Sequence, residues 1–125
     1  MLILLLITSI SSFCQTKKHS FTNEYANWRG RTDYFNWKVY ITGDSIFLAS
    51  IKQIVYYLDP SFKNPVQTIT KISGGKNFVL CTNGWGEFTI RIKIIFTNAK
   101  TAALNEVYRL DLHSPSKKKS NYKCP

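Results

Sequence analysis

The chain has 125 residues, of which 44% are hydrophobic and 14% aromatic, and its formal net charge is +10. A chain of this length forms one hydrophobic core, which excludes a second independent domain, so function must sit on one small scaffold. The three cysteines lack the C-x-x-C spacing of zinc and redox sites, and the sequence predicts neither a metal nor a cofactor.

The first thirteen residues are uncharged and apolar, too few to span a hydrocarbon core of about 30 Å as a helix. Ser12 and Cys14 precede Gln15 at the small-x-small spacing of a signal-peptide cleavage site. We therefore expect a signal peptide over residues 1–14, a linker over 15–20, and an exported protein, whether periplasmic, cell-surface or secreted. No basic segment precedes the apolar run, which leaves an uncleaved anchor helix or a lipid anchor on Cys14 as alternatives. In every case this segment is the expected membrane contact.

From residue 20 to 113, short runs of alternating apolar and polar residues are separated by turn residues about every ten positions. One-face-apolar strands need a second sheet to cover them, which predicts an all-β, immunoglobulin-like β-sandwich over residues 21–113 with about seven to eight antiparallel strands. The residues 73–76 (SGGK) indicate a hairpin turn. The expected strands lie near 21–28, 37–41, 54–58, 65–72, 77–81, 88–96 and 106–112.

The last nine residues contain four lysines, which predicts a basic disordered tail over residues 114–125. Such a tail is usually solvated, although it suits an acidic membrane surface or a nucleic acid. Cys81 and Cys124 remain after loss of the signal segment, and the sequence leaves open whether they pair or stay as free thiols.

Two loops, residues 58–65 (LDPSFKNP) and 84–88 (GWGEF), place an aromatic ring on a turn bounded by glycine or proline. A ring carried by a turn is usually there to contact something, so Phe62 and Trp85 are candidate binding residues. The structural alternative is that both rings plug the end of the sandwich as hydrophobic caps. Asp59 and Ser61 likewise suit a β-turn in which such side chains bond their own backbone.

The order and spacing of these motifs resemble the YEATS domain family, most closely its prokaryotic branch. The resemblance runs from about residue 37 to 113 and covers WKVY at 37–40, IVYYLDPSFKNP at 54–65, Phe78, GWGEF at 84–88 and, weakly, LDLH at 110–113. It implies an immunoglobulin-like sandwich whose end loops form a narrow aromatic slot, which in eukaryotic members reads acetyl- or crotonyl-lysine on histone tails.

By motif position, the resemblance implies that Phe62 and Trp85 sandwich a flat acyl amide. Ser61 would offer a hydroxyl to that amide, and the backbone N–H of Trp85 would donate to its carbonyl. Gly84 and Gly86 would let the backbone turn sharply and approach a ligand closely.

Departures from the family pattern predict a changed ligand. Asp59 stands where histone readers carry His, and a carboxylate there favours a cationic or hydrogen-bond-donating guest if the loop aims it inward. Arg109 stands where many of them carry an acidic residue. Asp33, with Tyr34 and Phe35 after it, aligns with the first-loop pocket position and is a candidate third wall.

The sequence therefore predicts a non-catalytic recognition module whose partner is a modified peptide or small molecule. Export argues against histones. Ser61, Asp111 and His113 contain the residue types of a catalytic triad, but no nucleophile elbow is present. One alternative is a structural or surface-interaction domain with a closed slot. The other is a nucleic-acid binder, based on cations that alternate on solvent faces near an exposed tyrosine: Lys38, Tyr40, Lys52, Arg91 and Lys93.

Overall fold

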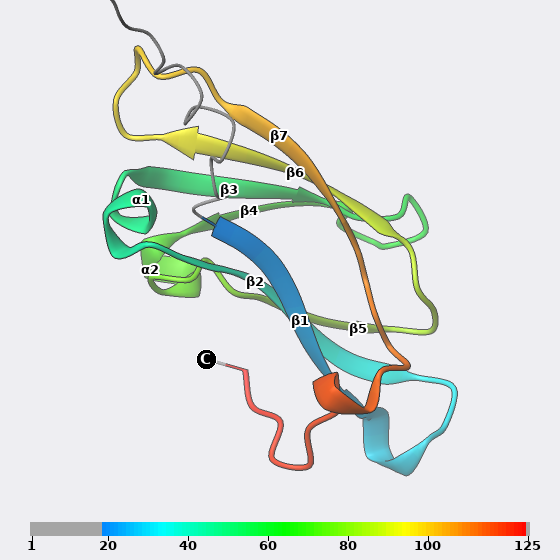
Figure 1. The fold of residues 1–125 in the computed structure, drawn as a ribbon. Helices are drawn as coiled ribbons and strands as arrows, with labels where there is room; N and C mark the ends of the chain where they lie inside the picture. The colour runs from blue at the N-terminus through cyan, green and yellow to red at the C-terminus, as the bar shows by residue number, and fades with distance from the viewer. Residues whose placement is uncertain (1–18, 125) are drawn as a thin grey trace, which may run out of the picture.

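A computed structural model describes residues 19–124 as two antiparallel sheets packed face to face (Figure 1). One sheet has three strands in the order β1-β2-β5, and the other has four in the order β4-β3-β6-β7. This confirms the predicted all-β, immunoglobulin-like sandwich. The strands are β1 (His19–Asn27), β2 (Phe35–Gly43), β3 (Ile51–Tyr57), β4 (Val66–Thr70), β5 (Leu80–Gly84), β6 (Thr89–Phe96) and β7 (Leu104–Arg109).

The core lies between the two sheets and follows the side-chain period of two. Trp37, Val39 and Ile41 of β2 are fully buried, whereas the alternating residues between them are not. The inward residues of β6 face them from the other sheet, with Ile90 and Ile94 at 0% exposure. Burial of these side chains removes their apolar surface from water and holds the sheets together.

Two short helices interrupt the β pattern. Asp44 begins α1 (Ser45–Ala49) by accepting a hydrogen bond from the backbone N–H of Ile46. α2 (Lys71–Gly74) occupies part of the predicted hairpin turn at 73–76, and a reciprocal capping box between Thr70 and Ser73 starts it. That turn prediction is therefore wrong in detail. Two 3-10 turns, η2 (Trp28–Gly30) and η3 (Pro115–Lys117), complete the elements.

The predicted signal peptide and residues 15–18 of the predicted linker lie outside the described residues. The predicted linker is wrong at its last two positions, because His19 and Ser20 belong to β1 and pair with Gly43 and Thr42 of β2. His19 is buried, contacts Glu106 of β7, and stacks on Phe47 with ring centroids 4.6 Å apart. Within residues 19–124, no helix is long and apolar enough to cross a membrane.

Residues 114–124, the C-terminal strap, pack on the outer face of the three-stranded sheet, so the predicted disordered tail is wrong over this range. The backbone N–H of Lys119 donates to the Tyr25 carbonyl at 2.8 Å, and Lys38 Nζ donates to the Lys123 carbonyl at 3.0 Å. The lysines suggested a solvated segment, but Lys117 Nζ also donates to Thr22 Oγ1 of β1 at 3.0 Å, so side chains as well as backbone hold the strap on the sheet.

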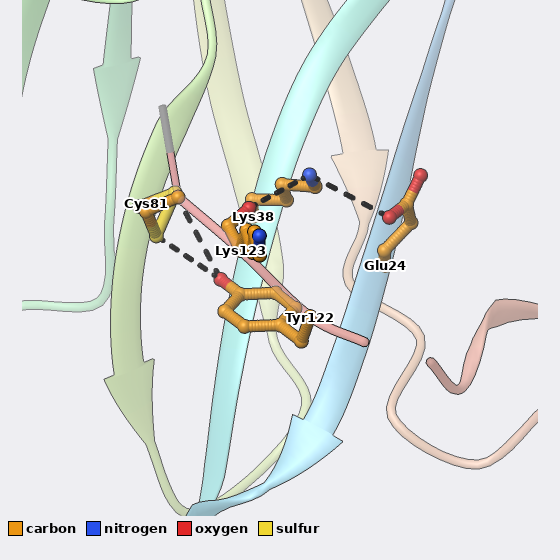
Figure 2. Close-up of a disulfide and its surroundings, with 6 residues drawn as sticks. Glu24, Lys38, Cys81, Tyr122 and Lys123 are labelled. Carbon is orange, nitrogen blue, oxygen red and sulfur yellow. Dashed lines mark hydrogen bonds and ion pairs between the residues drawn. A yellow bond between two sulfur atoms is a disulfide. The ribbon is translucent and has the colours of Figure 1, made fainter. Parts of the chain in front are cut away.

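A disulfide between Cys81 and Cys124 fixes the strap to β5 (Figure 2). The Cα atoms of the two cysteines are 6.0 Å apart, within the ordinary range for a disulfide. Tyr122 lies beside the bond, with Lys38 Nζ 5.6 Å from the centre of its ring. The question that the sequence left open is thus resolved in favour of pairing.

Candidate binding pocket

The two aromatic loops meet at one pole of the sandwich and border a pocket of about 560 Å³. Residues 58–65 follow β3, and residues 85–88 lead from β5 into β6, which pairs with β3. The adjacent ends of these strands therefore place both loops together. The lining includes six of the seven predicted site residues, namely Asp59, Ser61, Phe62, Gly84, Trp85 and Gly86.

The β3–β4 loop is closed by its own backbone. The Leu58 N–H donates to the Pro65 carbonyl at 2.7 Å, and the Phe62 N–H donates to the Asp59 carbonyl at 3.0 Å. Asp59 Oδ1 accepts from the Ser61 N–H at 2.9 Å, and this backbone hydrogen bond lowers the pKa of the carboxyl group. One oxygen of Asp59 thus fixes the turn that presents Ser61 and Phe62.

Phe62 forms the inner wall of the pocket. Its ring is partly buried, edge-on to Trp37 with centroids 6.3 Å apart and tilted against Phe88 at 5.4 Å. Gly84 makes room for it, since an added Cβ there would lie 3.3 Å from Phe62 Cζ. Trp37 Nε1, buried behind this contact, is the one buried side-chain polar atom without a hydrogen-bond partner in residues 19–124.

Trp85 forms the outer wall and is 64% exposed. Tyr34 packs edge-on against it with centroids 4.7 Å apart, and the Tyr34 hydroxyl donates to Asn83 Oδ1 at 2.7 Å. The Arg31 guanidinium lies 5.6 Å from the centre of the Trp85 ring. Trp85 is therefore supported by neighbouring side chains and is not stacked on Phe62.

The predicted third wall is only partly correct. Tyr34 lines the pocket, but Asp33 does not, because it forms two hydrogen bonds of 3.1 Å with Arg31, which lower its pKa. Phe35 does not line this pocket: its ring packs on Tyr25 and borders a different hollow. Sequence reasoning missed Arg31, whose only signal is its position two residues before Asp33.

Glu87 connects the pocket to a carboxylate–histidine cluster. It accepts hydrogen bonds from the Leu112 N–H at 2.7 Å and from His113 Nδ1 at 2.6 Å, and Asp111 Oδ1 lies 3.3 Å from the same nitrogen. Ligand atoms of Glu87, Asp111 and His113 lie within 4.8 Å of one another, close enough to share a cation. Ser61 lines the pocket and His113 a separate hollow, so the two are not brought together as a triad.

The pKa values of this cluster shift in opposite directions. The hydrogen bond with Glu87 raises the pKa of His113, and the same bond lowers the pKa of Glu87. Partial burial acts to raise the pKa of Asp111, but hydrogen bonds from Ser114 and from the His113 N–H outweigh it and lower this pKa to about 2. The cluster is therefore most strongly paired when His113 is protonated.

The cations predicted for nucleic-acid binding fall on different faces. Lys38 and Tyr40 lie on the three-stranded sheet, where both contact Glu24, at 3.6 and 2.7 Å. Arg91 and Lys93 lie on the four-stranded sheet. The predicted set is thus not one surface.

A family model described as the prokaryotic YEATS domain matches residues 35–107, more than half of the chain, including both pocket loops. The chain belongs to the prokaryotic YEATS domain family. It is 38% identical over 81 residues to the Protein AF-9 homolog of Candida glabrata, a match that covers 62% of this chain and 34% of that protein. The Protein AF-9 homolog of Saccharomyces cerevisiae is 36% identical over 80 residues, with the same coverage. This YEATS chain spans about a third of the length of these relatives.

Solved YEATS structures share the fold. The Yaf9 YEATS domain recognizing an H3K122suc peptide superposes with a TM-score of 0.59 at 28% identity, covering 79% of each chain. The Yaf9 YEATS domain bound to H3K27ac gives a TM-score of 0.56 at 26% identity, covering 82% of each chain. Both comparisons cover most of the described residues.

Gly84→Ala is expected to destabilise the fold by about 1 kcal/mol, because the new methyl group displaces Phe62. The matched control is Gly86→Ala, where an added Cβ has no atom within 4 Å and the expected change is below about 0.5 kcal/mol. Denaturant titrations of the two variants measure the difference. Equal free energies of unfolding would show that Phe62 does not depend on this contact.

The His113 cluster is expected to make stability depend on pH. A histidine whose pKa is raised by folding stabilises the folded state below its unfolded value of 6.5, and the contribution is lost as pH rises through the folded value. The melting-temperature difference between wild type and His113→Asn should therefore be larger near about pH 5.5 than near about pH 8.5. A difference that grows toward alkaline pH would contradict this pairing.

Proposed function

We propose that this YEATS domain is a recognition module that binds a small planar or acylated group, such as an acylated lysine side chain, in the pocket bordered by Phe62 and Trp85. The observation that carries the proposal is the convergence of two loops, each with one aromatic ring, on a single open pocket. Relatives support it, because the Yaf9 YEATS domain is described with H3K27ac and H3K122suc peptides.

The chemistry of the lining suits a flat amide. Aromatic pairs gain about 0.5–1.5 kcal/mol beyond burial, and a planar amide lying against an aromatic face is expected to gain a stacking contribution of similar kind. The Ser61 hydroxyl and the Trp85 N–H are the groups proposed to hydrogen-bond the amide. The Asp59 turn orders Ser61 before any ligand arrives, which reduces the entropy lost on binding.

The proposed action is binding without turnover. His113 is held by Glu87 and borders another hollow, so Ser61 lacks a histidine partner for nucleophilic attack. Reader function in the family supports the same reading.

Titration of acetyl-lysine, crotonyl-lysine and unmodified lysine peptides tests the proposal by calorimetry. Modified peptides should bind saturably, and Trp85→Ala should weaken their binding by about tenfold or more, since the aromatic outer wall of the pocket is lost while the backbone N–H at position 85 remains. Ile72→Ala is the matched control, because Ile72 is 98% exposed on α2, outside the pocket lining. Equal binding of modified and unmodified peptides would overturn recognition of the acyl group, and no binding of any of the three peptides would support a closed, structural slot instead.

We further infer that the protein works in an oxidising compartment outside the cytosol, where histones are not the partner. The Cys81–Cys124 disulfide supports this inference, since such bonds persist in exported proteins and are rare in the cytosol. The expected signal peptide over residues 1–14 is the sequence feature that would direct the chain there.

Export and oxidation can be tested together. Protein expressed from the complete coding sequence and recovered from its native host should begin at Gln15 and contain no free thiol. A form lacking residues 1–14, made in a reducing cytosol, should titrate two thiols and lose about 4 kcal/mol of stability, as expected for a link across 43 residues. Recovery of uncleaved, fully reduced protein from the native host would exclude export.

A further inference from the structure

The outer face of the four-stranded sheet carries cations without carboxylates. Ile90, Ile92 and Ile94 of β6 point into the core, so the alternating Arg91 and Lys93 point outward. Arg109 of β7 pairs with Thr89, one row closer to the pocket. We call Arg91, Lys93 and Arg109 the cationic face; the single acidic residue of β7, Glu106, points inward to His19.

No carboxylate in residues 19–124 forms a salt bridge with the three cations of this face. All seven Asp and Glu side chains lie in this range, and each already accepts an internal hydrogen bond or ion pair. Among the lysines and arginines described, only Arg31 and Lys38 form salt bridges with them. The charge of the cationic face is therefore available to an external partner.

The cationic face begins beside the binding pocket. Arg91 pairs with Tyr57, the residue immediately before the pocket-lining Leu58, and stacks over its ring at 4.7 Å. Along β6, Arg91 lies three residues, or about 10 Å, beyond Phe88 of the pocket lining. Lys63, on the pocket itself, is also exposed. A polypeptide with one side chain in the pocket would reach the face within about five extended residues.

The surroundings of these cations suit a polypeptide better than a nucleic acid. Val66 and Val107 flank the Tyr57–Arg91 pair in the same cross-strand row and are 55% and 68% exposed. Apolar side chains of a peptide can pack there. Single-stranded nucleic acid needs free aromatic rings for base stacking, whereas the Tyr57 ring is already covered by Arg91.

The other sheet offers no equivalent surface. The C-terminal strap crosses it, and Lys38 is paired there with Glu24 and with the Lys123 carbonyl (Figure 2). The outer face of the three-stranded sheet is therefore partly covered by the strap and its lysine is paired, whereas the four-stranded sheet exposes unpaired cations.

We propose that the cationic face binds acidic residues that flank the modified side chain, so that the preferred partner is an Asp/Glu-rich polypeptide. This inference rests on the proposed pocket function. It also gives a physical reason, separate from compartment, for excluding the lysine- and arginine-rich tails of histones, whose like charge this face would repel.

Three peptides with one central crotonyl-lysine and acidic, neutral or basic flanks test the proposal by fluorescence anisotropy. Acidic flanks should bind about tenfold more tightly than neutral flanks at low salt, from a few exposed ion pairs, and the advantage should shrink as salt rises. Arg91→Gln/Arg109→Gln should remove that advantage and leave the neutral-flank peptide unchanged. Lys76→Gln/Lys100→Gln, an equal charge change in loops outside the pocket lining and the cationic face, should preserve it.

The outcomes separate the two proposals. Equal affinity for the three peptides, with binding still lost in Trp85→Ala, would overturn the proposed role of the cationic face and leave the pocket function intact. Binding that requires acidic flanks, is equal for crotonylated and unmodified peptides, and persists in Trp85→Ala would overturn the proposed pocket function instead. Competition by a short single-stranded oligonucleotide, stronger than by the acid-flanked peptide, would overturn the polypeptide assignment.

Discussion

The contact of Phe62 with Gly84 and Trp37 is the interaction on which the site depends. It joins the β3–β4 loop to the end of β5, and therefore one sheet to the other, at the pole where the pocket opens. Gly84 favours this placement of the ring, since an added Cβ there would lie 3.3 Å from Phe62 Cζ and push the ring outward. Phe62 thus packs against the core and lines the pocket at once.

Trp85 differs from Phe62 because its support comes from the surface. Tyr34 and Arg31 hold it from the segment between β1 and β2, and Asp33 orients Arg31 in turn. One wall of the pocket is therefore fixed by core packing and the other by an exposed polar network. Exposed ion pairs of this kind contribute little to stability, so their effect is on the orientation of the tryptophan.

Acidic and basic side chains occupy different environments in this molecule. Carboxylates cap α1, close turns and pair with histidines or with β2 side chains, while most basic groups face solvent. The result is a net positive surface with local differences that depend on what covers each sheet. The disulfide contributes to this pattern by holding the strap over the three-stranded sheet and leaving the four-stranded sheet open.

Sequence alone determined the sandwich, the two aromatic loops and six of the residues that line the pocket, because alternation and glycine–proline turns are local patterns that can be recognised within a few residues. It missed the short helix α2, which a side-chain cap at Thr70 begins, and it could not place the Phe35 ring, which packs on Tyr25 away from the pocket. The docking of residues 114–124, the Cys81–Cys124 pairing and the bracing of Trp85 by Arg31 were decided by tertiary structure. Each of these joins residues far apart in the chain or depends on side-chain direction, and local pattern does not encode either.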